Sequence, residues 1–197
     1  MKGDLGCFFE RGDRAVLLLH APGQTPEALQ PLTEPLARGG LAVGVPALFQ
    51  PGVHWSGWLR TARAAFLRLR EGRDAVSVCA LGDSAALALL LAEEYAPDQL
   101  LLAPSRGRHA ALPERFALMT LRRRAWRGLF ALEARPQILL PTDAAAARRA
   151  RRLSRRLGAC VTGPFPPEAL AGALAACLGV GKNRSRPLAE DEILKTV

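Results

Sequence analysis

One stretch of seventeen residues restricts the fold of this chain more than any other. Residues 76–92 are Val-Ser-Val-Cys-Ala-Leu-Gly-Asp-Ser-Ala-Ala-Leu-Ala-Leu-Leu-Leu-Ala. The pattern predicts a buried strand, a tight turn of small residues and an apolar helix. A strand with apolar residues on both faces is typical of a parallel sheet that helices cover on both sides. The stretch therefore predicts an α/β fold.

The rest of the chain repeats the alternation of strand and helix. Strands are expected at Cys7–Glu10, Ala15–His20, Leu41–Pro46, Ala75–Ala80, Leu100–Ala103, Gln137–Pro141 and Ala159–Thr162. Helices are expected at Thr25–Arg38, Trp58–Glu71, Ser84–Tyr95, from about Ala144 onward and at Pro167–Leu178. Pro31 and Pro35 predict an irregular first turn in the first helix, and Gly39-Gly40 predict its end.

Length and hydropathy indicate one globular domain. A chain of 197 residues and 21.1 kDa fits a single domain, which we expect at residues 1–178. Residues 105–135 break the alternation and predict a small cap or insertion, and residues 179–197 predict a tail. No apolar run reaches the roughly 18 residues of a membrane span, and Asp4 stands where a signal peptide would be basic. We therefore expect a cytoplasmic protein.

Neither the cysteines nor the histidines predict a metal or cofactor site. The chain has no C-x-x-C pair and no clustered histidines, so reduced, buried thiols are the expected state. The residues concerned are Cys7, Cys79, Cys160 and Cys177, and His20, His54 and His109.

The net charge of +9 comes almost wholly from arginine, because the chain has only three lysines. The densest cluster is Arg148–Arg156, in a helix whose alanines and leucines predict an inward stripe. Arginine suits phosphate, but no known nucleic-acid motif and no aromatic residue accompanies the cluster. We expect a solvated surface rather than a nucleic-acid site, and a basic interaction module remains an alternative.

Four stretches carry a family resemblance. They are residues 8–20, which end in a strand and His20, residues 25–46, the turn at residues 80–84, and Leu100-Leu101-Leu102-Ala103-Pro104. Together they resemble the α/β-hydrolase family, most closely its small bacterial carboxylesterases and monoacylglycerol lipases. The resemblance implies a three-layer sandwich with a mostly parallel sheet of about six to seven strands and helices on both faces.

The resemblance implies a nucleophile elbow, G-x-S-x-G, at the turn after the strand. With the apolar helix in register, the five positions fall on Ala80, Leu81, Gly82, Asp83 and Ser84. Gly82 then stands where the nucleophile would be, and its φ is expected to be positive. A second register makes Ser84 the nucleophile of a G-x-S-x-A variant.

Other parts of the implied catalytic site are missing or altered. The family's catalytic histidine follows the last strand, but no histidine follows His109. Asp143 stands near the position of the family's acid and is equally suited to cap the next helix. The resemblance implies two backbone donors for the oxyanion. Pro22 occupies the position of the first although proline has no N–H, and the second would be the Asp83 N–H.

Three functions follow from these residues. The first is a catalytically degenerate protein that binds a small acyl or ester-like ligand in a pocket above Gly82, a function that is compatible with a homo-oligomer. Its expected lining is His20, Pro22, Gly82, Asp83, Ser84, His54 and Trp55, with Asp143 nearby. The second is an ester or thioester hydrolase that uses Ser84 with His20 or His109 as base. The third is the basic interaction module.

Overall fold

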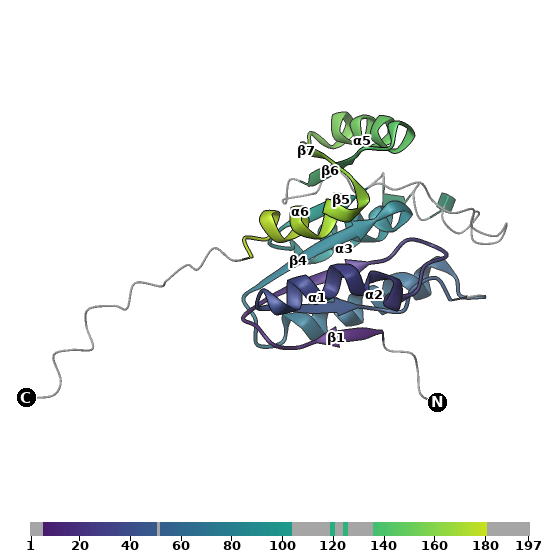
Figure 1. The fold of residues 1–197 in the computed structure, drawn as a ribbon. Coiled ribbons are helices and arrows are strands. Elements are labelled where there is room, and N and C mark those ends of the chain that lie inside the picture. Colours follow the sequence, from purple (N-terminus) through teal and green to yellow (C-terminus); the bar gives the residue numbers. More distant parts are fainter. Residues whose placement is uncertain (1–5, 51, 104–118, 121–123, 126–135, 181–197) are drawn as a thin grey trace, which may run out of the picture.

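The computed structural model describes residues 6–50, 52–103, 119–120, 124–125 and 136–180. Within them one sheet of seven strands has the order β1-β3-β2-β4-β5-β6-β7 (Figure 1). The strands are β1 (Cys7–Phe9), β2 (Arg14–Leu19), β3 (Leu41–Val45), β4 (Ala75–Leu81), β5 (Leu100–Ala103), β6 (Gln137–Pro141) and β7 (Cys160–Phe165). Strands β2 to β7 run parallel and β1 is antiparallel to β3. The predicted direction of the six main strands is confirmed.

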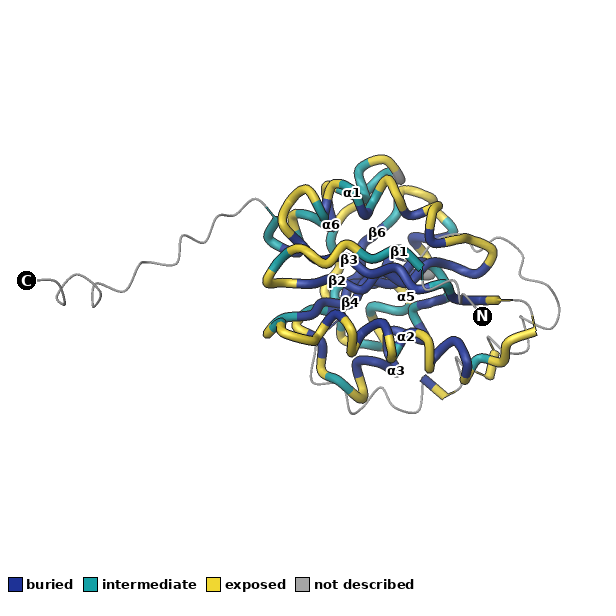
Figure 2. Tube along the Cα trace, turned by 90° about the horizontal axis from the view of Figure 1, so that it is seen from below, coloured by how far each residue is buried: buried dark blue, intermediate teal, exposed yellow. Residues whose placement is uncertain are grey.

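Helices cover both faces of the sheet. They are η1 (Pro26–Leu29), α1 (Gln30–Arg38), α2 (Trp55–Arg70), η2 (Gly82–Ser84), α3 (Ala85–Tyr95), α5 (Ala144–Leu157), η4 (Pro167–Ala169) and α6 (Leu170–Cys177). Figure 2 shows α1 and α6 on one side of the buried strands and α2 and α3 on the other. Two apolar cores, one on each side of the sheet, hold the layers together. The predicted three-layer α/β sandwich is confirmed.

Several element boundaries differ from the sequence-based expectations. Helix α2 begins at Trp55 instead of Trp58, because the His54 side chain accepts a hydrogen bond from the Ser56 N–H and caps the helix. Helix α3 begins one residue after Ser84. Strand β7 continues to Phe165. The irregular start of the first helix is confirmed, since a 3₁₀ turn precedes α1.

Some expectations lie outside the described residues. Most of the predicted insertion at 105–135 falls there, as do His109 and residues 181–197 of the predicted tail. In the described ranges, no helix is long and apolar enough to cross a bilayer.

Candidate functional site

The turn after β4 has the backbone conformation of a strand-to-helix elbow. Leu81 is extended, with φ −102° and ψ 127°, and Gly82 turns the chain with φ +62°. A side chain with a Cβ rarely adopts this left-handed conformation, whereas glycine adopts it without steric cost. The expected positive φ of Gly82 is confirmed. The residue in the strained position of the elbow therefore has no side chain that could act as a nucleophile.

Ser84 lies two residues further on and is fully buried. Its Oγ is 2.8 Å from the Leu19 carbonyl oxygen and 2.8 Å from the Leu81 carbonyl oxygen, and donates to them. Among the described residues, these two carbonyls are its hydrogen-bond partners, and none is a histidine. The hydroxyl proton therefore points at backbone acceptors instead of a general base.

His20 is buried at the end of β2 and holds a loop. Its Nε2 accepts a hydrogen bond of 2.9 Å from the Leu48 N–H, so the ring carries its proton on Nδ1, 3.1 Å from the Ala21 carbonyl oxygen. The ring also contacts Phe49 edge to face, with centroids 5.5 Å apart. Burial lowers the pKa of His20 and favours the neutral ring that this bond requires. His20 is thus a structural residue in this arrangement.

The loop after His20 offers no free pair of backbone donors. Pro22 is buried and has no N–H. The neighbouring Ala21 N–H donates to Gln24 Oε1 at 3.0 Å, and the Gln24 N–H returns a bond to the Ala21 carbonyl at 3.1 Å. A turn closed by the Gln24 side chain therefore stands where the resemblance implies the oxyanion loop.

Two further positions complete the comparison with a catalytic site. Asp143 follows β6 and caps α5, with Oδ1 accepting from the Ala146 N–H at 2.8 Å. Strand β7 ends at Phe165, and Pro166 follows it where the resemblance implies a histidine. The described residues supply an acid at this edge but no histidine beside it.

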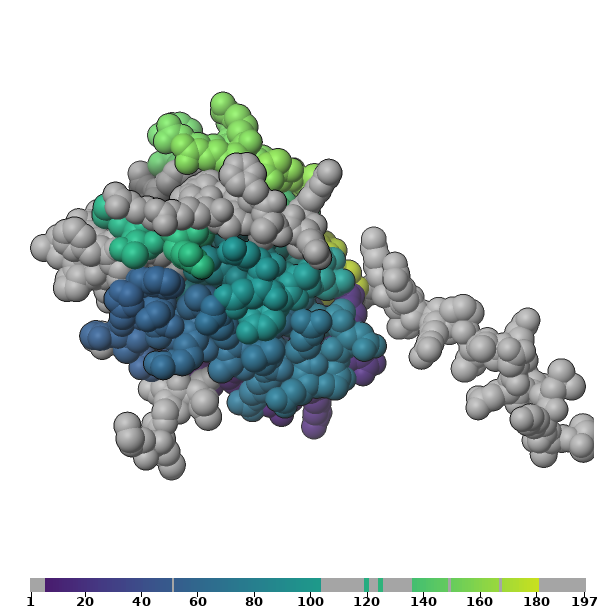
Figure 3. Space-filling view, turned by 180° about the vertical axis from the view of Figure 1, so that it is seen from behind, coloured from purple at the N-terminus to yellow at the C-terminus, as the bar shows by residue number. Residues whose placement is uncertain are grey.

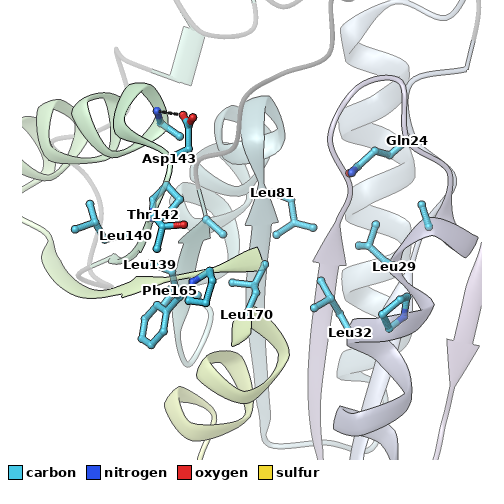
Figure 4. Close-up of a pocket in the computed structure, with 16 residues that line it drawn as sticks. Gln24, Leu29, Leu32, Leu81, Leu139, Leu140, Thr142, Asp143, Phe165 and Leu170 are labelled. Carbon is cyan, nitrogen blue, oxygen red and sulfur yellow. Dashed lines mark hydrogen bonds between the residues drawn. The ribbon is translucent and has the colours of Figure 1, made fainter. Parts of the chain in front are cut away.

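A cavity of about 510 Å³ opens at the carboxyl edge of the sheet, on the side that α1 and α6 cover. Figure 4 shows apolar side chains from both sides of the opening, with the amide of Gln24 on one rim and Thr142 and Asp143 on the other. The described lining contains no lysine, arginine or histidine. It comprises Gln24, Ala28, Leu29, Pro31, Leu32, Leu81, Ala103, Leu139, Leu140, Pro141, Thr142, Asp143, Ala146, Phe165, Pro166 and Leu170. This volume and lining suit a small, mainly apolar molecule.

Of the residues predicted to form the site, Asp143 is the one that the described lining of this cavity contains. The elbow contributes Leu81 rather than Gly82. His54 and Trp55 lie at the start of α2, where His54 Nδ1 is 3.0 Å from Ser56 Oγ. The remaining predicted residues, His20, Pro22, Gly82, Asp83 and Ser84, are absent from the described lining. Their part in ligand binding stays a prediction.

Sequence reasoning missed the residues that shape the cavity. Gln24, Leu29, Phe165 and Leu170 come from four separate segments, and nothing in their spacing brings them together. Only the fold class pointed to this region, because all of these segments adjoin the carboxyl edge of the sheet, where ligands bind in α/β proteins.

Comparisons with known proteins agree with this architecture. A metagenome-derived lipolytic enzyme, reported with LipS and LipT, superposes with a TM-score of 0.68 at 14% identity, covering 91% of this chain and 98% of that chain. The monoacylglycerol lipase of Paleococcus ferrophilus gives 0.67 at 12% identity, covering 87% and 96%. The thioesterase domain of the curacin biosynthetic pathway gives 0.63 at 13% identity, covering 87% and 93%. No family model and no curated protein matches the chain. The likeness is one of fold.

Proposed function

We propose that this protein, which has the α/β-hydrolase fold, does not hydrolyse esters and instead binds a small uncharged ligand in the cavity at the carboxyl edge. The observation that carries the proposal is Gly82 at φ +62° in the elbow. Ester hydrolysis in this architecture needs a nucleophile at that position, a histidine to take its proton and two donors for the oxyanion. Glycine supplies no nucleophilic atom.

The surrounding residues support the loss of catalysis. The Ser84 hydroxyl donates to backbone carbonyls, and the Ala21 N–H is already bonded to Gln24. Removing one oxyanion donor costs about 3 kcal/mol of transition-state stabilisation, a factor of about 10² in rate. The alternative, an active hydrolase using Ser84, would require that buried hydroxyl to leave both carbonyls and meet a base.

The cavity indicates the chemical class of the ligand. Its interior is apolar, so most of the binding free energy would come from burying an acyl or similar chain. Gln24 uses Oε1 to accept from Ala21, which leaves its Nε2 hydrogens for an acceptor such as an ester carbonyl. The Asp143 carboxylate on the opposite rim would repel a carboxylate ligand. A neutral acyl or ester-like compound fits both rims.

A binding titration tests the proposal with a matched pair of ligands. Methyl octanoate should raise the free energy of unfolding by about 2.7 kcal/mol at one hundred times its Kd, whereas octanoate should bind at least about tenfold more weakly. The Leu32→Trp variant places a larger side chain in the cavity and should weaken this effect. Leu67→Trp, on the exposed face of α2, should retain it.

Two outcomes would contradict the proposal. One is equal stabilisation of the Leu32→Trp and Leu67→Trp variants, since the ester would then bind elsewhere. The other is turnover of the ester, because octanoate released by the wild-type protein would indicate a working catalytic site.

We further propose a cytoplasmic location. All four cysteines are free thiols, and two of them, Cys79 and Cys177, lie on the same side of the sheet without a disulfide. Unpaired thiols are typical of a reducing compartment. Cell fractionation with a cytoplasmic and a secreted marker tests this location.

A further inference from the structure

Helix α5 presents an arginine surface that the rest of the described protein does not neutralise. Arg148, Arg151, Arg152 and Arg155 are exposed, and no described residue forms a hydrogen bond or ion pair with them. We name these four residues the α5 arginine patch. Figure 1 places α5 (green) at the end of the sheet remote from β1, and Figure 3 shows green atoms at that end of the molecule.

Most arginines between residues 6 and 103 have a partner among the described residues. Arg38, Arg63 and Arg68 pair with carboxylates, and Arg73 donates to the carbonyls of Gly12 and Leu69. The exposed Arg11 and Arg60 have no such partner, but they lie far apart in the sequence. The α5 arginine patch therefore differs in that its unpaired arginines are clustered on one helix. Between residues 136 and 180 the only acidic residues are Asp143 and Glu168, and neither lies among the four arginines in the sequence.

The spacing within the patch is unfavourable for an isolated helix. Arg148 and Arg152, and likewise Arg151 and Arg155, are four residues apart, so their side chains are neighbours about 6 Å apart along the axis. Like charges at this spacing destabilise a helix. An external anion would relieve the repulsion, and the planar guanidinium group binds phosphate through two parallel hydrogen bonds.

The helix suits a nucleic-acid duplex better than a membrane. Its apolar stripe is already used inside the protein, since Ala146 and Ala150 are buried and Leu153 and Leu157 pack on the core. An interfacial membrane helix needs that stripe for insertion into lipid. The four arginines lie within an arc of about 100° on the exposed face of α5, so all four can face the closely spaced phosphates of one duplex.

We propose that the α5 arginine patch docks on the phosphate backbone of double-stranded nucleic acid, without reading its sequence. The helix has no aromatic residue to stack on bases, which disfavours single strands. The Asp143 carboxylate caps the start of α5 and would repel phosphates there, so the phosphates would contact the middle and last turns of the helix. The proposal is independent of the ligand cavity.

Fluorescence anisotropy with a labelled 20-base-pair duplex of arbitrary sequence tests the proposal on the full chain. Four phosphate contacts give a slope of log K against log[KCl] of about −3.6, so affinity should fall about 150-fold between 50 and 200 mM KCl. Arg148→Gln/Arg152→Gln should reduce the magnitude of the slope by about 2. Arg11→Gln/Arg60→Gln, which removes the same charge from two exposed arginines in the first half of the chain, should keep the full slope.

Three results would overturn the proposal. They are the absence of duplex binding at 50 mM KCl, an equal loss in the two double variants, and binding to phosphatidylserine vesicles but not to the duplex. If the α5 variant does not fold, the wild-type protein still provides a test. A slope of log K against log[KCl] near zero for duplex binding would contradict phosphate contacts.

Discussion

The Ser84 hydroxyl donates to the Leu19 carbonyl, 2.8 Å away, and thereby ties the elbow turn to the end of the neighbouring strand β2. The Leu81 carbonyl lies at the same distance, so the single proton has two buried acceptors. A catalytic serine must direct its proton to a base. The hydrogen bonds of the Ser84 hydroxyl therefore stabilise the elbow turn.

Replacing Ser84 by alanine should therefore reduce stability. The Ser84→Ala variant loses a buried hydroxyl bond, and the free energy of unfolding should fall by about 1–2 kcal/mol. Urea denaturation measures this change. Ser56→Ala removes an exposed hydroxyl beside the His54 cap and should change stability less than Ser84→Ala does, and an equal effect of the two variants would contradict the structural role.

The conformation of Gly82 predicts opposite effects at two glycines. Gly82→Ala places a Cβ at φ +62° and should destabilise the protein by about 1–2 kcal/mol. Gly172 lies inside α6 with an ordinary φ and open space around its Cβ position, so Gly172→Ala should stabilise by about 0.5–1 kcal/mol. Thermal and urea unfolding of both variants measure the difference. Destabilisation of the same size at both sites would contradict the elbow assignment.

Burial of neutral His20 predicts an acid-sensitive stability. The folded pKa of His20 lies below its ordinary value of 6.5 because burial disfavours the charged ring. The unfolded chain then binds more protons as pH falls below about 6.5, so stability is complete above that pH and declines toward the lower folded pKa.

Unfolding free energies between pH 7.5 and 5 test this dependence. His20→Asn should flatten the decline, since the variant has no ring to protonate. His54→Gln, at the exposed cap of α2, should keep it. A wild-type profile that stays flat through this window would contradict the buried neutral ring.

Two substitutions at Asp143 should distinguish its role as a helix cap from the effect of its negative charge. Asp143→Ala removes the acceptor for the Ala146 N–H and should cost about 1 kcal/mol of stability. Asp143→Asn keeps a capping oxygen, so its stability should remain close to wild type. If the carboxylate repels anions from the cavity, Asp143→Asn should also bind octanoate more tightly than the wild-type protein does. Unchanged octanoate binding would contradict this role.

The fold was predictable because its signals are local. Runs such as Ala15–Leu19 and, apart from Ser77, Val76–Leu81 are apolar on both faces, which is typical of a central parallel strand. The glycine in the elbow was also predictable, because a sharp turn between that strand and an apolar helix demands a left-handed residue.

The cavity was not predictable in the same way. Gln24 and Phe165 lie 141 positions apart in the sequence and meet only through the sheet order. The bond from the Leu48 N–H to His20 likewise joins residues that share no motif. Histidine is an uncommon cap, so the start of α2 at Trp55 carried no recognisable signal in the sequence.

Labelling with a fluorophosphonate probe tests the proposed loss of catalysis most directly. Such probes react with a serine only when its hydroxyl is activated by a base, so a mass spectrum of the intact wild-type protein should show no adduct after incubation with excess probe. An active serine hydrolase treated in parallel confirms the reagent. A stoichiometric adduct at Ser84, abolished in Ser84→Ala, would contradict the account and establish a working nucleophile.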